Sequence, residues 1–300
     1  MKRLLFFVNP NAGHTEIRNS LMQVLQIFTA GGYEVTVHPT AGPKDLTRQI
    51  VRRGAEYDLI VCTGGDGTLN EATSGLMQLE NRPPLGYIPG GTVNDVAASL
   101  GLARDPIMAA QDIVHGKPFG IDIGSFGENR WFDYVAAFGL FTNVPYETPQ
   151  ADKRIWGRMA YFFNGVQALG EVRPVHACVS WDGKTVEDDI LDGLVCSTTS
   201  VGGFKAAKTV GEYNISLNDG LHEVVLVRDI KNLADFSVVA AKLLRMDFSD
   251  ENYFITGQTG SIHFSFERPV AWTLDGEFGG NVTEVDIRNH SRAIEVIVPR

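Results

Sequence analysis

The segment LIVCTGGDGTLNEATSGLMQL, residues 59–79, contains a short apolar run, a glycine-rich turn and the start of a helix. The run Leu59–Cys62 is continuously apolar, which is typical of a strand buried on both faces of a parallel sheet. Gly64–Thr68 form the turn, and the pattern after it predicts a helix over 70–79. This order predicts one βα unit of a parallel α/β domain.

The same alternation continues on both sides of this segment, over about the first 125 residues. Strands are predicted at 4–8, 33–38 and 85–89, and helices at 17–28, 45–53 and 93–100. Repeated βα units predict a three-layer α/β domain, with a parallel sheet between helices.

The pattern changes after residue 125, where short strands and turns predominate. The clearest case is a predicted hairpin over 175–190, with its turn at Asp182-Gly183-Lys184. Helices are predicted only at 152–169 and 232–246. We therefore expect two domains: an α/β domain over 1–125, and a mostly antiparallel β-sandwich over 126–289.

Three glycine-bearing loops follow strands of the first domain, at 9–13, 64–68 and 90–95. Ligands of open parallel sheets bind at the carboxyl ends of the strands, so these loops should converge on one crevice. Glycine lets backbone N–H groups approach a phosphate closely, and the helix N-termini that follow favour negative charge. The three loops together indicate a nucleotide polyphosphate site, although any one of them alone could be an ordinary tight βα turn.

Two common phosphate-binding motifs are absent. The sequence Gly183-Lys184-Thr185 looks like the end of a Walker A loop, but Cys178 occupies the position that requires glycine. The window that begins at Gly65 fails the dinucleotide-binding pattern because its sixth residue is Asn70. Nucleotide binding must therefore use a different loop arrangement.

Composition narrows the range of partners. There are 36 acidic and 26 basic residues, a net charge of −10, which argues against nucleic-acid binding. The three cysteines form no CxxC pair, as expected in a reducing compartment, and no apolar run is long enough to cross a membrane. A soluble cytoplasmic protein is expected.

The motifs VNPNAG (8–13), GGDGTLNE (64–71), GGTVND (90–95) and GIDIG (120–124) occur in this order. Together they resemble the bacterial diacylglycerol kinase family, which belongs to a superfamily with the sphingosine and ceramide kinases. The blocks YETPQADKRIWGRMAY (146–161), NDGLHEVVLV (218–227) and LDGE (274–277) extend the resemblance over essentially the whole chain.

The resemblance implies an ATP- and magnesium-dependent lipid kinase. The substrate that it favours is diacylglycerol, which the reaction would convert into phosphatidic acid. Its active site would lie in the cleft between the domains, and the last strand, at about 290–300, would pack back on the first domain. GGDGT is shared with NAD kinases and phosphofructokinases. An NAD kinase therefore remains an alternative, as does a nucleotide-binding regulator without turnover.

The resemblance also assigns residues to sites. The positions that match ATP contacts are Asn9, Pro10, Asn11, Ala12, Gly13, Thr40, Gly64, Gly65, Asp66, Gly67, Thr68, Leu69, Asn70, Glu71 and Thr92. An acidic network corresponds to Asp66, Asp95 and Asp122, and a magnesium site to Ser216, Asp219 and the carbonyl of Leu221. The chain departs from the pattern at His14, where some members have a lysine, and a neutral imidazole is a weaker phosphate partner.

Glu277 matches the proton acceptor of the family, and Asp275 is the competing carboxylate. On turn chemistry alone, Asp275-Gly276-Glu277 would be a hairpin turn with solvated charges. Asn218-Asp219-Gly220 is likewise a strong turn signal. The sequence leaves these alternatives open.

Access to a lipid requires peripheral and reversible contact with a membrane. The predicted 152–169 helix combines Lys153, Arg154 and Arg158 with the aromatic residues Trp156, Tyr161, Phe162 and Phe163. This mixture suits an interfacial helix, but it also suits a helix with an aromatic core side and solvated charges. The resemblance is compatible with a homodimer.

Overall fold

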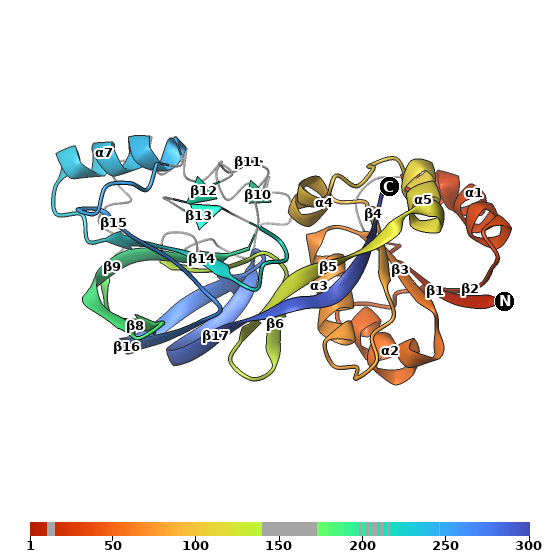
Figure 1. Cartoon of the computed structure of the whole chain (residues 1–300), viewed down its shortest axis with the longest axis horizontal. Helices are drawn as coiled ribbons and strands as arrows, with labels where there is room; N and C mark the ends of the chain where they lie inside the picture. The colour runs from red at the N-terminus through yellow and green to blue at the C-terminus, as the bar shows by residue number, and fades with distance from the viewer. Residues whose placement is uncertain are drawn as a thin grey trace. The chain divides into compact units, whose positions relative to one another are not determined.

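The chain forms a mixed α/β structure made of two units (Figure 1). The computed structural model describes residues 1–10, 16–139, 173–197, 200–201, 204–205, 209–210, 213–214, 216–245 and 247–300. Unit 1 comprises Met1–Ile123 and Ser291–Arg300, and unit 2 comprises Gly124–His290. The chain passes between the units within β5 (Lys117–Phe126) and within β17 (Glu277–Val298).

Unit 1 is organised around a parallel sheet in the order β4-β3-β1-β2. Its strands are β1 (Lys2–Val8), β2 (Tyr33–Pro39), β3 (Leu59–Gly64) and β4 (Leu85–Pro89). Every residue of β3 is buried, as its continuous apolar run predicts. The end of β17 joins this sheet, because Val296 pairs in parallel with Leu85 of β4.

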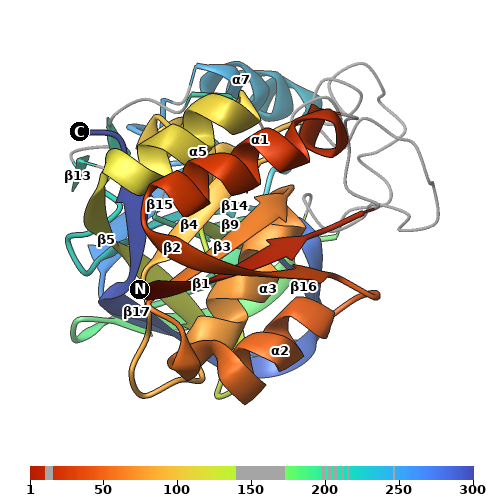
Figure 2. The ribbon, with the colours of Figure 1, turned by 90° about the vertical axis from the view of Figure 1, so that its right-hand side faces the viewer.

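Helices lie on both sides of these strands (Figure 2). On one side are α1 (Glu16–Ala30) and α5 (Pro106–His115), and on the other are α2 (Asp45–Arg53) and α3 (Asp66–Leu76). The short α4 (Asp95–Leu100) follows β4, and a 3-10 turn, η1 (Gly54–Glu56), follows α2. One apolar cluster includes Leu4, Phe6 and Val61 of the sheet together with residues of α1 and α5.

Two of these helices differ from the sequence prediction. The helix α3 begins at Asp66 rather than at Asn70, because the extended Gly65 is its N-cap and the GDGT turn already winds into the helix. The helix α5 was not predicted. Its start nevertheless carries local signals, since Asp105 accepts the N–H groups of the first turn and Pro106 occupies the first helical position.

Unit 2 is rich in strands and resembles a β-sandwich. Antiparallel pairing gives the order β15-β14-β9-β7-β16-β17, and β8 pairs with both β9 and β16. The strands are β6 (Arg130–Phe132), β7 (Val135–Gly139), β8 (Val175–Trp181), β9 (Lys184–Cys196), β14 (His222–Arg228), β15 (Phe254–Thr259) and β16 (Ser261–Leu274). Two short pairs are β10 (Ser200–Val201) with β11 (Phe204–Lys205), and β12 (Thr209–Val210) with β13 (Tyr213–Asn214).

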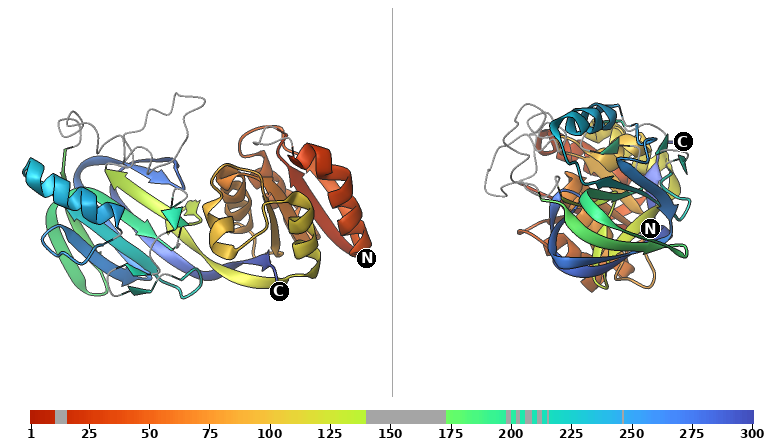
Figure 3. Two further views of the ribbon diagram at one scale, coloured as in Figure 1. Left: turned by 90° about the horizontal axis from the view of Figure 1, so that it is seen from above. Right: turned by 90° about the vertical axis from the view of Figure 1, so that its left-hand side faces the viewer.

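The helix α7 (Leu233–Leu244) packs on strands β14 and β15 (Figure 3). The helix expected over 152–169 lies outside the described residues. Among the helices that the structure describes, none is both long and apolar enough to span a membrane. None of the three cysteines forms a disulfide; Cys62 and Cys196 are buried, whereas Cys178 is only partly buried.

Trp272 is the centre of the unit 2 core. Its side chain is fully buried, and its ring lies 4.7 Å from that of Phe138, 5.1 Å from Phe126 and 5.2 Å from Phe264, measured between centroids. Trp272 lies on β16 three residues before Asp275, so this packing holds the strand that leads to the expected catalytic carboxylates.

We predict that Trp272→Ala lowers the free energy of unfolding by ~3–5 kcal/mol, because it leaves a large cavity among aromatic rings. Urea unfolding followed by circular dichroism measures this loss. Val238→Ala, at a position 41 % exposed on α7, is the control and should change stability by about 0.5 kcal/mol or less. Equal effects of the two substitutions would contradict the assignment of Trp272 as the core residue.

Candidate functional site

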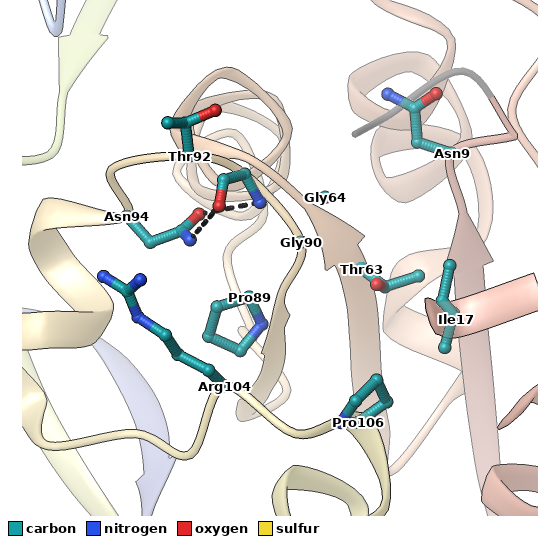
Figure 4. Close-up of a pocket in the computed structure, with 11 residues that line it drawn as sticks. Asn9, Ile17, Thr63, Gly64, Pro89, Gly90, Thr92, Asn94, Arg104 and Pro106 are labelled. Carbon is teal, nitrogen blue, oxygen red and sulfur yellow. Dashed lines mark hydrogen bonds between the residues drawn. The ribbon is translucent and has the colours of Figure 1, made fainter. Parts of the chain in front are cut away.

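A pocket of about 250 Å³ lies in unit 1 at the carboxyl ends of β1, β3 and β4 (Figure 4). The residues that line it are Asn9, Ile17, Thr63, Gly64, Pro89, Gly90, Gly91, Thr92, Asn94, Arg104 and Pro106. They include members of all three glycine-bearing loops. The structure therefore brings the described parts of these loops to one place, as expected at the carboxyl edge of a parallel sheet.

The second and third loops touch through their backbones. The N–H of Gly90 donates to the carbonyl of Gly64 at 2.7 Å, and the Tyr87 hydroxyl donates to the same carbonyl at 2.9 Å. A Cβ on Gly91 would lie 2.7 Å from the Cα of Gly65. Only glycine permits this approach at position 91, so the contact between the loops itself requires Gly91.

Several N–H groups of the third loop are directed to acceptors within the protein. The N–H of Gly91 donates to Oδ1 of Asn94 at 3.1 Å, and the Asn94 amide nitrogen donates back to the carbonyl of Gly91 at 2.7 Å. The backbone N–H of Asn94 donates to Oδ2 of Asp66 at 3.0 Å. A phosphate in this pocket must therefore rely largely on other donors.

Asp95 lies close enough to Asp66 to influence the ionisation of Asp66. Burial, and then the negative charge of Asp95, raise the pKa of Asp66 to about 6, against the lowering effect of the backbone N–H groups that it accepts. Asp95 is itself buried. The structure thus joins two of the three residues of the expected acidic network.

Asp122, the third, is buried on β5, where its Oδ1 accepts the backbone N–H of Arg292 at 2.7 Å. Arg292 has a φ of 49°, in the left-handed region. This hydrogen bond of Asp122 therefore helps to hold Arg292 of β17 in its left-handed conformation.

Other expected nucleotide contacts lie around the pocket. Asn9 donates from Nδ2 to Oγ1 of Thr68 at 3.4 Å, which connects the first loop to the second. The N–H of Thr40 donates to the carbonyl of Val8 at 2.9 Å, so Thr40 lies beside the end of β1. The carbonyl of Pro10 accepts a hydrogen bond from Arg18.

The remaining contacts expected in the second loop belong to α3, which contains Gly67, Thr68, Leu69, Asn70 and Glu71. Leu69 is buried in the core. Glu71 accepts the backbone N–H of Lys44 at 2.8 Å, and this carboxylate therefore contacts the start of α2. Asn11, Ala12, Gly13 and His14 lie outside the described residues.

Of the expected ATP contacts, the pocket lining contains Asn9, Gly64 and Thr92. Sequence reasoning did not assign the pocket residues Ile17, Thr63, Pro89, Arg104 and Pro106. Three of these, Ile17, Pro89 and Pro106, give the pocket an apolar part, and Arg104 is the one charged residue in the lining that the structure describes. The signal in the sequence was the Asp105-Pro106 helix start, which places Arg104 at the edge of the sheet.

The expected catalytic carboxylates occupy the β16–β17 hairpin of unit 2. Asp275 and Gly276 form its two-residue turn, with φ values of 49° and 83°, as Asp-Gly sequences favour. Asp275 is not solvated, because it is only 8 % exposed. Its Oδ2 accepts the N–H of Asp133 at 2.6 Å, and its Oδ1 accepts those of Tyr134 and Val135 at 3.0 Å each.

Glu277 follows this turn as the first residue of β17, and its side chain is exposed. Thr273 donates from Oγ1 to the Glu277 carbonyl at 3.0 Å, which closes the hairpin next to the turn. The two carboxylates thus have different environments: Asp275 binds backbone amides, and Glu277 is accessible to a substrate.

The expected magnesium ligands share one bend of unit 2. The N–H of Leu221 donates to Oδ1 of Asp219 at 3.1 Å, and the Asn289 side chain donates to the Leu221 carbonyl at 3.0 Å. The hydroxyl of Ser216 donates to Oδ1 of Asn218 at 3.1 Å. A hydroxyl, a carboxylate and a carbonyl are hard oxygen donors, and this donor set fits magnesium.

The raised pKa of Asp66 gives the ligand-free protein a defined pH dependence. The folded state holds this proton more tightly than the unfolded state, so its stabilising contribution is complete below about pH 4 and disappears as the pH rises through about 6. We predict that Asp66→Asn raises the unfolding free energy above pH 6 by ~1–3 kcal/mol, because it removes the negative charge that burial and Asp95 disfavour, while the amide oxygen can still accept from Asn94.

Thermal unfolding between pH 5 and pH 8, without nucleotide or divalent cations, measures this effect. The difference between wild type and variant should grow from pH 5 to pH 7. Glu80→Gln, at an exposed position after α3, is the control for the change in charge. A constant offset across the pH range would refute the electrostatic explanation.

The contacts of Asp275 predict a structural cost. Asp275→Ala should lower the unfolding free energy by ~2–4 kcal/mol, because three backbone N–H groups lose their acceptor. Urea unfolding tests this against Asp286→Ala, which removes a carboxylate 52 % exposed on β17 and should cost less than about 1 kcal/mol. A cost no greater than that of the control would show that these hydrogen bonds do not hold the hairpin.

The chain is similar to known proteins along its whole length. A family model described as the diacylglycerol kinase catalytic domain matches residues 3–126. A diacylglycerol kinase of Bacillus subtilis (strain 168) is 35 % identical over 302 residues, covering 100 % of this chain and 97 % of that protein. A diacylglycerol kinase of Staphylococcus aureus (strain bovine RF122 / ET3-1) is 32 % identical over 299 residues, covering 99 % and 93 %.

Solved structures show the same similarity in fold. A crystal structure from Bacillus anthracis str. Sterne superposes with a TM-score of 0.83 at 25 % identity, covering 99 % of this chain and 97 % of that chain. A second from the same strain, of a diacylglycerol kinase, gives a TM-score of 0.75 at 22 % identity with the same coverage, and shows similarity of fold alone. Because relatives more than 30 % identical match this chain from end to end, the chain belongs to the diacylglycerol kinase family and is a lipid kinase.

Proposed function

We propose that the protein transfers the γ-phosphate of ATP to the free hydroxyl of diacylglycerol, giving phosphatidic acid, in a magnesium-dependent reaction. The observation that carries the proposal is the pocket at the carboxyl edge of the parallel sheet, where three glycine-bearing loops meet. The full-length relatives named as diacylglycerol kinases support the choice of lipid. No described feature favours NAD as the acceptor.

Unit 1 supplies the nucleotide site in this proposal. The polar residues Asn9, Thr63 and Thr92 line the pocket together with its apolar part, as a ligand with both a base and phosphates requires. The further positions Pro10, Thr40, Gly65, Asp66 and Thr68 lie around it. We also propose that unit 1 has the three-layer arrangement expected from its sequence. Residues of both units would contribute to the active site.

Glu277 is the proposed proton acceptor. As the lipid oxygen forms its bond to the γ-phosphorus, the bond to the bridging oxygen of ADP breaks, and the hydroxyl proton passes to the Glu277 carboxylate. An exposed carboxylate next to a rigid turn suits this role. Asp275 acts as a positioning residue, since its oxygens hold that turn through backbone N–H groups.

Magnesium has two proposed places. Bound with the nucleotide, it supplies positive charge on the phosphate oxygens. Ser216, Asp219 and the Leu221 carbonyl would hold a second ion within unit 2, where the hydrogen bond from Asn289 already orients the carbonyl. This bend includes the residue before β14, so an ion here would order that part of unit 2.

The lipid substrate requires contact with a membrane surface, which we propose to be peripheral and reversible. The 152–169 segment with its cationic and aromatic residues is the proposed contact, and it lies outside the described residues. We also propose that the protein is cytoplasmic, that it has no nucleic-acid partner and that it forms a homodimer.

A transfer assay tests the activity directly. The purified protein receives radiolabelled ATP and magnesium with diacylglycerol in mixed micelles, with other hydroxyl lipids, or with NAD. A labelled chloroform-soluble product from diacylglycerol is expected. Labelled NADP would contradict the lipid assignment, and ATP binding without any product would indicate a regulator.

Glu277→Gln should lower turnover by about 10²- to 10⁴-fold, because it removes a positioned base, while ATP affinity and stability stay the same. Initial rates and titration calorimetry measure the two quantities. Glu284→Gln makes the same chemical change on the same strand, at a side chain 71 % exposed, and should leave the rate unchanged. Near-normal turnover of Glu277→Gln would exclude Glu277 as the base.

A further inference from the structure

Arg104 is the one charged residue among the described residues that line the pocket of unit 1. It stands directly before the N-cap of α5. Figure 4 shows its side chain on the same side of the pocket as Asn94 and Thr92, whereas Asn9 and Ile17 lie on the other side. The pocket therefore has a cationic side next to the third glycine-bearing loop.

The guanidinium of Arg104 has no carboxylate partner among the described residues. Its hydrogen bond runs from Nη2 to the backbone carbonyl of Val93 at 3.3 Å. The adjacent Asp105 forms no ion pair with it, and Oδ1 of Asp105 instead accepts the N–H groups of Ile107 and Met108 at 3.0 Å and 2.8 Å. The positive charge of Arg104 thus remains available at the pocket.

The residues around the pocket make a positive charge necessary for binding a phosphate. The backbone N–H groups of Gly90, Gly91 and Asn94 already donate to protein acceptors. Asp66 and Asp95 contribute negative charge close to these loops, and the whole chain has a net charge of −10. A phosphate chain at this edge would meet repulsion unless a cation compensates for it.

We propose that Arg104 binds the phosphate chain of the nucleotide and is the protein's own cation in this pocket. The inference rests on the proposed nucleotide-binding function of the pocket. A guanidinium presents a planar set of N–H donors that matches two phosphate oxygens at once, which the hydroxyl of Thr92 and the amide of Asn94 do not.

Binding of ATP, ADP and adenosine to the full chain tests this assignment. Titration calorimetry, with adenosine measured by displacement, compares wild type with Arg104→Ala and Arg104→Lys. Arg104→Ala should weaken ATP and ADP about tenfold, as expected for loss of a charge-assisted contact on an exposed side chain, and should leave adenosine unchanged. Arg104→Lys should recover part of the loss, because it keeps the charge without the planar donor set.

Arg52→Ala is the matched control, since it removes the same charge from an exposed position of α2 away from the pocket lining. It should bind all three ligands as wild type does. Higher salt should weaken ATP binding by wild type more than by Arg104→Ala.

Three results would overturn the inference. If wild type binds ATP and Arg104→Ala binds it equally well, Arg104 does not contact the nucleotide, and the proposed function still stands. If Arg104→Ala weakens the binding of adenosine as much as that of ATP, Arg104 contacts the base instead. If wild type binds neither ATP nor ADP, the proposed function fails and this inference fails with it.

Discussion

The backbone contact between the second and third glycine-bearing loops determines the geometry of unit 1 at the carboxyl edge of its sheet. The carbonyl of Gly64 receives the N–H of Gly90 and the hydroxyl of Tyr87, and Gly65 and Gly91 approach so closely that a Cβ would not fit. This contact brings the end of β3 against the end of β4. The pocket, the position of Asp66 beside Asn94 and the start of α4 all depend on it.

As a consequence, several backbone N–H groups of the third loop are already paired with acceptors inside the protein. A glycine-rich loop at the end of a strand suggests free amides that wait for a phosphate, yet Gly90, Gly91 and Asn94 have protein acceptors. One of these acceptors is the partly buried carboxylate of Asp66, which adds negative charge where an anionic substrate should bind. Electrostatic balance then depends on cations that the loop does not contain, from a side chain such as Arg104 and from magnesium.

In unit 2, one short motif combines two roles that looked like alternatives. Asp275-Gly276 forms the tight hairpin turn that its sequence favours, and the same turn presents Glu277 to solvent. The buried carboxylate of Asp275 holds the turn against residues 133–135. A rigid turn next to an accessible carboxylate is a suitable support for a base, because a positioned group loses less freedom when it reacts.

The sequence by itself determined the local elements. Apolar runs and helical periodicity placed β3, β4 and α2 almost to the residue, and the order of motifs identified the family, because these signals lie within short windows of the chain. It also located the glycine-bearing loops, although it missed α5 and with it Arg104. The roles proposed for individual side chains remain predictions.

Only the tertiary structure decided which groups meet. The carboxylate of Asp275 binds N–H groups about 140 residues away, and that of Asp66 binds one 28 residues away. Such pairings depend on how strands are ordered in a sheet and on which side chains are buried together, and periodicity within one segment contains neither. For the same reason, no local pattern predicts that Oδ1 of Asp122, which the family resemblance groups with Asp66 and Asp95, accepts the backbone N–H of Arg292 on β17. Burial, which raises the pKa of Asp66, likewise arises only when the loops have come together.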